Sequence, residues 1–396
     1  MTALRWRSAA FPVAAAALLA PAAAVLQSKA MAPLALVCLA LSVLASRRAT
    51  GRWPWPDGRM LWGWLALAAL GLASSLWAPE PGRSVATGLQ FLAIVLLSVA
   101  AARAVAPEDG GAVGTALFWG LLLGLGLALL DAVTGNAVRL LVRGLPAARP
   151  DIEFGLKPAG SVAALLLPLL VATPFPRPVR LAALAACVLA VVLLPGDTAK
   201  IAALLGAAVA VLARRLRLRR LIAAGLVAGF LIAPFLGAML GRPSVVAHLP
   251  ISAVHRILIW DFAHQRAAER PLLGWGLEAS RVIPGGHGGV PAENLDRIGE
   301  TRPEARAFFA RDDVELLPLH PHDGPLQLQL ELGWVGLLLA TMLVAALALR
   351  APGPAALGVL ASGAVTFLFS FGVWQPWWLA TQGLAFALVA SLEKRA

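Results

Sequence analysis

The sequence contains few of the residues on which soluble and disulfide-bonded proteins depend. Tyrosine is absent, cysteine occurs twice, and charged side chains make up only 14% of the 396 residues. Cys38 and Cys187 both fall inside apolar runs, so we interpret them as packing residues rather than as a disulfide or metal site. With so few charges and 59% hydrophobic residues, the composition excludes an ordinary soluble domain and indicates that lipid surrounds most of the chain.

Long apolar runs occupy much of the sequence. Runs such as 112–133, 221–240 and 326–349 contain about 20 residues, enough for a helix to cross a hydrocarbon core of roughly 30 Å. We therefore predict an all-α polytopic membrane protein with about twelve transmembrane helices. The predicted spans lie near residues 9–26, 31–46, 60–77, 85–103, 112–133, 159–174, 180–195, 199–213, 220–241, 325–349, 354–372 and 375–392.

Basic residues predict the orientation of this bundle. If the N-terminus is cytoplasmic, the loops on that side collect Arg5, Arg7, the basic run 214–220, Lys394 and Arg395. Cytoplasmic loops are enriched in Lys and Arg, so both termini are expected in the cytoplasm, and the net charge of +12 calls for no nucleic-acid partner. The first run also resembles a cleaved signal peptide, but the many later spans favour an uncleaved helix.

One long segment, residues 242–324, interrupts the pattern of helices and short turns. It follows nine predicted spans in residues 1–241 and precedes three in residues 325–396, so it is expected to be a periplasmic loop. A connection of about 80 residues is usually functional, and this one contains all six histidines. Within this segment, the residue pattern predicts a helix at 251–268 and a second, polar helix at 300–314.

The stretch 319–333, Leu-His-Pro-His-Asp-Gly-Pro-Leu-Gln-Leu-Gln-Leu-Glu-Leu-Gly, is the most informative part of the chain. Pro325 suits the first turn of a helix, and Asp323 or Gly324 suits its cap. His322 then lies just before a helix N-terminus, whose partial positive charge keeps an imidazole neutral and able to accept a proton. His320 is a competing base, and a histidine that only caps or packs at the end of the loop is the structural alternative.

Four cations are candidates to bind an anionic group at the outer surface. Arg256 lies on the predicted helix 251–268, Lys200 opens a span after a tight turn, and Arg139 and Arg143 belong to a second outward segment. A cation at the membrane surface needs an anionic partner. A neutral base beside such cations suits glycosyl transfer from a lipid pyrophosphate, because the base takes a hydroxyl proton and the cations stabilise the leaving group.

These residues resemble the O-antigen ligase/polymerase superfamily. The resemblance is carried by His322, Asp323, Leu326, Gln327, Glu331 and Gly333, by Arg256 and Trp260 followed by Gly274 and Gly276, and by Lys200. Many relatives have Asn in place of Asp323 and Arg in place of Lys200. A lysine keeps the charge but loses the planar, two-pronged contact with phosphate.

The resemblance implies an O-antigen ligase of the bacterial inner membrane. Such an enzyme transfers a glycan from undecaprenyl diphosphate to a sugar hydroxyl of lipid A-core oligosaccharide at the periplasmic face, with inversion. The base would be His322. The pyrophosphate would be held by Arg256 and Lys200, together with Arg143 or Arg139. The site would be supported by Asp323, Gln327 and Trp260. No metal or nucleotide cofactor is implied, and the sequence has no Walker-type loop or evident cluster of metal ligands.

Three alternatives remain open at this point. An O-antigen polymerase or a protein O-oligosaccharyltransferase belongs to the same superfamily, although a single dominant outer loop favours the ligase. A secondary transporter or lipid flippase would be built from internal repeats with polar residues at mid-membrane, and neither feature is evident. A structural scaffold with an outer binding loop fits the hydropathy but has no need of His322.

Overall fold

The computed structural model describes residues 8–55, 58–106, 110–146, 152 and 154–393. Within these ranges the regular structure is helical, without strands, and one isolated bridge pairs Gly289 with Glu315. The α-helices are α1 (Ala10–Leu26), α2 (Met31–Thr50), α3 (Arg59–Ala73), α4 (Pro81–Val105), α5 (Gly111–Val133), α6 (Ala137–Arg143), α8 (Leu156–Leu166), α9 (Arg177–Leu193), α10 (Asp197–Leu212), α11 (Arg219–Ile232), α12 (Leu236–Leu240), α13 (Pro243–Val246), α14 (Ile251–Glu269), α15 (Ala292–Ile298), α16 (Pro303–Phe309), α17 (Gly324–Leu349), α18 (Pro354–Phe369) and α19 (Pro376–Leu392).

A helix lies at each of the predicted spans. In the described part of the chain, five are long and apolar enough to cross a membrane, namely Ser28–Thr50, Pro81–Val105, Gly111–Val133, Arg219–Leu240 and Gly324–Leu349, and several others are shorter apolar helices. The all-helical, polytopic prediction therefore agrees with the structure. The number of about twelve crossings stays a prediction, since length and composition establish only five candidates.

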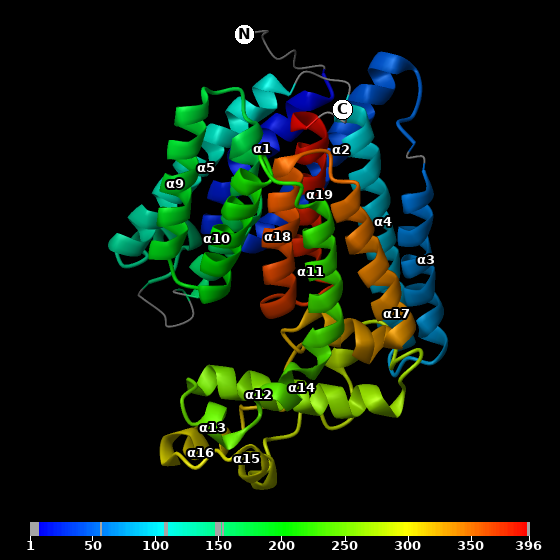
Figure 1. Ribbon diagram of the computed structural model, residues 1–396, viewed down its shortest axis with the longest axis vertical. Coiled ribbons are helices and arrows are strands. Elements are labelled where there is room, and N and C mark those ends of the chain that lie inside the picture. The colour runs from blue at the N-terminus through cyan, green and yellow to red at the C-terminus, as the bar shows by residue number, and fades with distance from the viewer. Residues whose placement is uncertain (1–7, 56–57, 107–109, 147–151, 153, 394–396) are drawn as a thin grey trace.

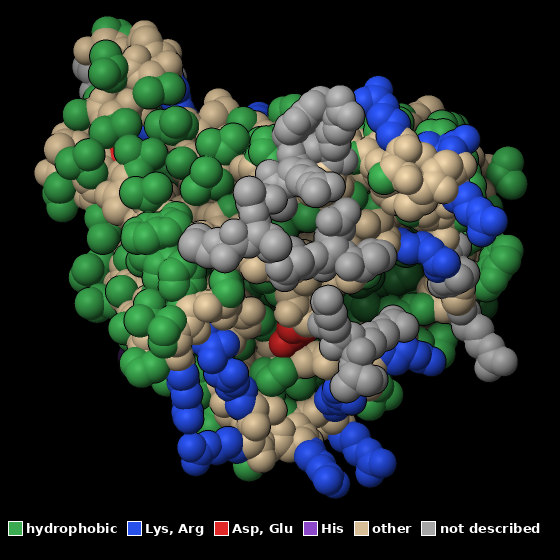
Figure 2. Space-filling model, turned by 90° about the horizontal axis from the view of Figure 1, so that it is seen from above, with side chains coloured by type: hydrophobic (Ala, Val, Ile, Leu, Met, Phe, Trp, Pro, Cys, Tyr) green, Lys and Arg blue, Asp and Glu red, His purple; other side chains and the backbone are tan. Residues whose placement is uncertain are grey.

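The molecule has two parts, a helical bundle and a smaller lobe at one end of it (Figure 1). Helices α12 to α16 form the lobe, and α11 and α17 connect it to the bundle (Figure 1). Figure 2, the view from the end opposite the lobe, shows many Lys and Arg side chains around the edge of that end and few acidic ones. This distribution is typical of a cytoplasmic face. The orientation itself stays a prediction, and Arg5, Arg7, Lys394 and Arg395 lie outside the described residues.

The lobe has an apolar core of its own around α14. Val254, Leu258 and Phe262 recur at the helical spacing of four and are buried, together with Ile257. The predicted helix at 251–268 is therefore confirmed as α14. The second helix, which was predicted at 300–314, is shorter in the structure and corresponds to α16. Another short helix, α15, lies just before it in the chain.

Helix α17 is broken, although its sequence predicts one continuous span. Gly333 has φ +64° and divides the helix into a buried first half and a second half that runs up the bundle (Figure 1). A Cβ atom added to Gly333 would lie 2.2 Å from the backbone of Leu272. A side chain cannot fit there, and the left-handed conformation also favours glycine.

The segment 271–276 fills this break and supplies the missing backbone partners. Trp275 N donates to Leu330 O at 2.9 Å, Gly276 N donates to Glu331 O at 2.8 Å, and Trp334 N donates to Pro271 O at 2.8 Å. Backbone groups freed inside a membrane-embedded helix need such partners. The lobe and the bundle are thus joined directly beside the first half of α17.

Candidate active site

A pocket of about 390 Å³ lies between α14 and the chain that leads into α17. Both predicted catalytic residues, His322 and Arg256, contribute to its wall. The lining residues are Ile251, Ser252, His255, Arg256, Ile259, Phe308, Pro318 and His322. Helix α14, helix α16 and the segment before α17 therefore converge on one small cavity.

The segment that carries His322 is held from both sides. Asp323 is the N-cap of α17, and its Oδ1 accepts a hydrogen bond from Leu326 N at 2.9 Å, which confirms the predicted cap. Trp260 Nε1 donates to Pro321 O at 2.8 Å, so the buried indole of α14 fixes the residue before His322. His322 itself has φ +55°, a conformation that is unfavourable for a residue with a side chain and persists because its surroundings enforce it.

The hydrogen bonds of His322 define which ring nitrogen is basic. Its Nδ1 lies 2.7 Å from Ser370 O. A carbonyl oxygen only accepts, so Nδ1 carries the proton and Nε2 of the neutral ring is left with a lone pair. Burial lowers the pKa of His322, and the nearby Arg256 lowers it further, against the opposing effect of the Ser370 hydrogen bond. The ring is therefore neutral and its Nε2 is suited to accept a proton.

The neighbouring His320 has a different environment. It is buried, and its Nδ1 accepts a hydrogen bond from His322 N at 3.2 Å. Burial, together with the positive charges around it, lowers the pKa of His320 to about 3. Its ring is not part of the pocket lining. Geometry therefore favours His322 over His320 as the base, with His320 as a residue that orients it.

Arg256 differs from most arginines of the lobe, which form ion pairs. Its side chain is half-buried, burial lowers its pKa, and no described carboxylate lies within salt-bridge distance of it. By contrast, the lobe forms the ion pairs Arg266–Glu269, Arg281–Glu278, Arg297–Asp261, Arg302–Glu300, Arg306–Asp296 and Arg311–Asp313. A partly desolvated guanidinium at a pocket wall favours an anionic ligand.

The other predicted pyrophosphate ligands lie on different helices. Arg139 corrects our expectation, because its side chain is fully buried and bound to Asp131 Oδ2 at 2.5 Å, and also to Asn136 and Ile152. A guanidinium that is paired and fully buried in this way holds α6 to α5 and is not accessible to a substrate. Arg143 donates to Leu26 O at 2.9 Å, at the end of α1. Figure 1 shows α6 at the edge of the bundle, away from α14.

Lys200 lies in the first turn of α10, and its Nζ is 3.2 Å from Asp197 Oδ1. This ion pair is partly exposed, and the Asp197 side chain is 92% exposed. Exposed pairs of this kind are weak and easily exchanged for a stronger anion. Lys200 is not among the residues that line the pocket around His322, so its part in the site stays a proposal.

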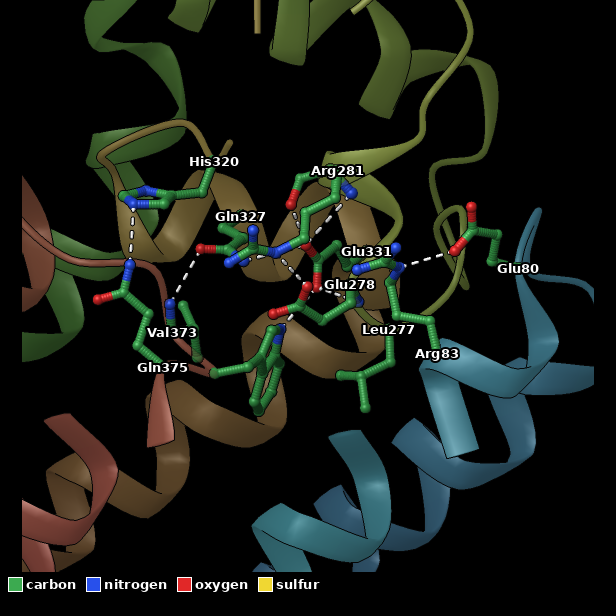
Figure 3. Close-up of polar contacts among 12 residues, drawn as sticks. Glu80, Arg83, Leu277, Glu278, Arg281, His320, Gln327, Glu331, Val373 and Gln375 are labelled. Atoms are coloured by element: carbon green, nitrogen blue, oxygen red, sulfur yellow. Dashed lines mark hydrogen bonds and ion pairs between the residues drawn. The ribbon is translucent and has the colours of Figure 1, made fainter. Parts of the chain in front are cut away.

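The structure also reveals a buried carboxylate that the sequence reasoning left without a role. Glu331 is fully buried on the first half of α17 and accepts hydrogen bonds from three separate segments (Figure 3). The donors to Oε2 are Glu278 N at 2.8 Å and Trp374 Nε1 at 2.6 Å; those to Oε1 are Ser280 Oγ at 2.6 Å, Gln327 Nε2 at 3.0 Å and Ser280 N at 3.4 Å. Its match to the family motif was the only signal in the sequence.

Gln327 extends this network toward His322. Its side-chain Oε1 accepts from Val373 N at 3.0 Å, while its Nε2 binds Glu331 (Figure 3). Val373 and Trp374 belong to the turn between α18 and α19, the turn that also supplies Ser370 O to His322. The support role expected of Gln327 is thus consistent with its contacts.

Glu278 and Arg281 form a second charged pair beside this network. Glu278 is 9% exposed and its Oε2 lies 2.6 Å from Arg281 Nε (Figure 3). Burial raises the pKa of Glu278, although Arg281 partly offsets this. The positive charge of Arg281 also reaches His320 and helps to lower its pKa. Among the described residues, no group of three or more His, Cys, Asp or Glu side chains is arranged to hold a metal ion.

The curated proteins that this chain resembles share one name and come from species of Rickettsia. A curated protein of Rickettsia conorii is 30% identical over 186 residues, which are 44% of this chain and 41% of that protein. A protein of Rickettsia bellii is 30% identical over 202 residues, which are 48% of this chain and 46% of that protein. Both bear the name "putative polysaccharide ligase". The aligned region thus spans less than half the length of these relatives.

A family model described as O-antigen ligase matches residues 181–341. The matched region contains Lys200, Arg256, His322 and Glu331, and so includes the pocket wall and the buried carboxylate. These similarities support a function of the polysaccharide-ligase type. Together with the curated relatives, the match shows that residues 181–341 are similar to the O-antigen ligase family.

Proposed function

We propose that this protein is an O-antigen ligase that transfers a glycan from undecaprenyl diphosphate to a sugar hydroxyl of lipid A-core oligosaccharide. The observation that carries the proposal is the meeting of two groups at one pocket. His322 presents a basic Nε2 there, and Arg256 presents a half-buried cation without a carboxylate partner among the described residues. A base beside an anion site is the pair of groups that this transfer needs.

In the proposed step, the acceptor oxygen attacks the anomeric carbon of the donor sugar. The new glycosidic C–O bond forms as the bond between that carbon and the pyrophosphate oxygen breaks. His322 Nε2 takes the hydroxyl proton, and the electron pair of the broken bond remains on undecaprenyl diphosphate, whose charge Arg256 stabilises. Attack opposite the leaving group inverts the anomeric centre. No metal or nucleotide cofactor takes part in this scheme.

Lys200 is proposed as a second pyrophosphate ligand, because its exposed ion pair with Asp197 is readily replaced by a stronger anion. Arg139 is left out of the donor site, and Arg143 is a weaker candidate because its Nε already binds the α1 carboxyl end. Catalysis is placed at the periplasmic face of the inner membrane, the side predicted for the lobe. The membrane lipids would hold the undecaprenyl chain beside the bundle.

A polymerase or a protein O-oligosaccharyltransferase would use the same chemistry on a different acceptor. The purified protein in lipid nanodiscs should therefore receive a synthetic undecaprenyl-diphosphate oligosaccharide together with three acceptors. These are rough-type lipopolysaccharide, a second lipid-linked oligosaccharide and an unstructured Ser-rich peptide. Gain of mass by lipopolysaccharide alone supports the ligase, whereas gain by either other acceptor replaces it with the corresponding alternative.

Variants at the pocket test the assigned roles in this assay. His322→Ala is expected to lower the transfer rate at least about 10²-fold, the usual contribution of a general base. Arg256→Ala should lower it by about 10²- to 10³-fold, as for the loss of one stabilising donor. His248→Ala and Arg311→Ala are matched controls on the lobe surface, and both should transfer normally. Normal transfer by His322→Ala would refute the mechanism.

A further inference from the structure

The pocket contains a second histidine that the mechanism above does not use. His255 lines the same cavity as His322 and is adjacent to Arg256 on α14. Its ring packs edge-on against Phe309, with centroids 5.7 Å apart, and against Phe308 at 6.4 Å. Two imidazoles therefore share one small pocket.

The hydrogen bonding of His255 leaves one nitrogen available to a ligand. Its Nε2 lies 2.8 Å from Glu315 O, so Nε2 carries the proton and donates. Its Nδ1 then has a lone pair and, among the described residues, no hydrogen-bond partner. Glu315 is itself fixed, because it pairs with Gly289 in an isolated bridge and its Oε2 lies 2.8 Å from His287 Nδ1. The orientation of the His255 ring is thus set from outside the pocket.

The pocket therefore presents two nitrogen atoms that can accept a hydrogen bond, His322 Nε2 and His255 Nδ1. Ser252 adds a hydroxyl, and Phe308 with Ile259 adds apolar surface. Lone pairs repel phosphate oxygens, so the His255 side of the pocket disfavours the pyrophosphate and favours hydroxyl donors. Apolar surface with a few placed polar groups is typical of small-ligand pockets of roughly 300–1,000 Å³.

We propose that His255, with Ser252, forms the acceptor-sugar subsite and that His255 is a positioning residue. His255 Nδ1 accepts a hydrogen bond from one hydroxyl of the acceptor sugar while His322 takes the proton of a neighbouring hydroxyl. The subsite thus selects a sugar that bears two adjacent hydroxyls, and the pyrophosphate of the donor stays at Arg256. This inference rests on the proposed function, because it assigns the acceptor of that reaction.

Two substitutions separate this role from a purely structural one. In His255→Asn, the side-chain oxygen reaches the position of Nδ1 and keeps the acceptor, but the bond to Glu315 is lost. In His255→Gln, the amide nitrogen reaches the position of Nε2 and keeps the bond to Glu315, but no acceptor faces the sugar. His248→Ala, an exposed histidine of the same lobe, serves as the control.

Initial rates of transfer are measured in nanodiscs, with rough-type lipopolysaccharide and the synthetic donor titrated separately. His255→Gln should raise the KM for lipopolysaccharide about tenfold, the effect of one lost hydrogen bond, and change the donor KM less than twofold. His255→Asn should restore the acceptor KM to near the wild-type value. The opposite order, with Gln normal and Asn impaired, would assign His255 to holding Glu315 and overturn the proposal.

A binding measurement keeps the inference separate from the proposed reaction. Binding of rough-type lipopolysaccharide is followed by thermophoresis on the His322→Ala protein, with and without His255→Gln. If the double variant binds lipopolysaccharide about tenfold more weakly, the subsite is supported. This holds even if the wild-type protein transfers no glycan to lipopolysaccharide, because that result would refute only the ligase function. Equal binding by both proteins, or no binding by either, would refute the subsite.

Discussion

Replacing Glu331 with glutamine tests how the buried network holds the site. The two side chains have the same shape, so the change alters hydrogen bonding and charge without opening a cavity. Each carboxylate oxygen serves at least two donors, Glu278 N and Trp374 Nε1 on one and the Ser280 groups with Gln327 on the other. The amide nitrogen of glutamine replaces one of these oxygens and cannot accept.

The expected loss follows from this count of donors. Whichever oxygen is replaced, at least two buried donors lose their acceptor and face another donor. An unsatisfied buried group costs about 1–3 kcal/mol, so the substitution should lower the free energy of unfolding by about 2–6 kcal/mol. For a large domain this corresponds to a fall of roughly 4 °C or more in the melting temperature. The turn that supplies Ser370 O would also loosen, and transfer should fall with it.

Gln329 provides the matched control for this experiment. It lies on the same half of α17 and is 5% exposed, but its side-chain oxygen has no hydrogen-bond partner among the described residues. Gln329→Leu should therefore leave the melting temperature unchanged or raise it. Melting is followed in detergent by size-exclusion chromatography after heating, alongside the transfer rate in nanodiscs. If Glu331→Gln melts and transfers like the wild type, the network has no supporting role.

Three further changes test other parts of the structure. Burial lowers the pKa of His322, so its imidazole remains neutral at pH values below the ordinary histidine pKa of about 6.5. The transfer rate should therefore remain level from pH 8 to pH 6.5 and fall only at more acid pH. A fall centred above pH 6.5 would contradict this. Gly333→Ala should yield little folded protein, since its Cβ would meet the Leu272 backbone, whereas Gly126→Ala, with open space around it, should fold normally. Lys200→Ala should raise the donor KM and leave the acceptor KM unchanged, and an unaffected donor KM would remove Lys200 from the donor site.

The sequence alone determined those features that depend on neighbouring residues. Hydropathy is a local property, so a helix was found at every predicted span, and the apolar spacing around Val254 predicted α14. The cap at Asp323 could also be predicted from the sequence, because an N-cap needs only a side chain three residues before its partner N–H. These local rules placed His322 at the start of a helix before any tertiary contact was known.

Only the tertiary structure decided what each polar side chain does. The base nitrogen of His322 is defined by Ser370, 48 residues away, and the acceptor nitrogen of His255 by Glu315, 60 residues away. Arg139 was an additional candidate beside Arg256 in the sequence, yet Arg139 is enclosed by partners and Arg256 lines a pocket. The sequence states the type and charge of each residue, whereas its burial and hydrogen-bond partners arise from contacts between distant segments. Burial and hydrogen-bond partners determine whether a charged side chain stabilises the fold or binds a substrate.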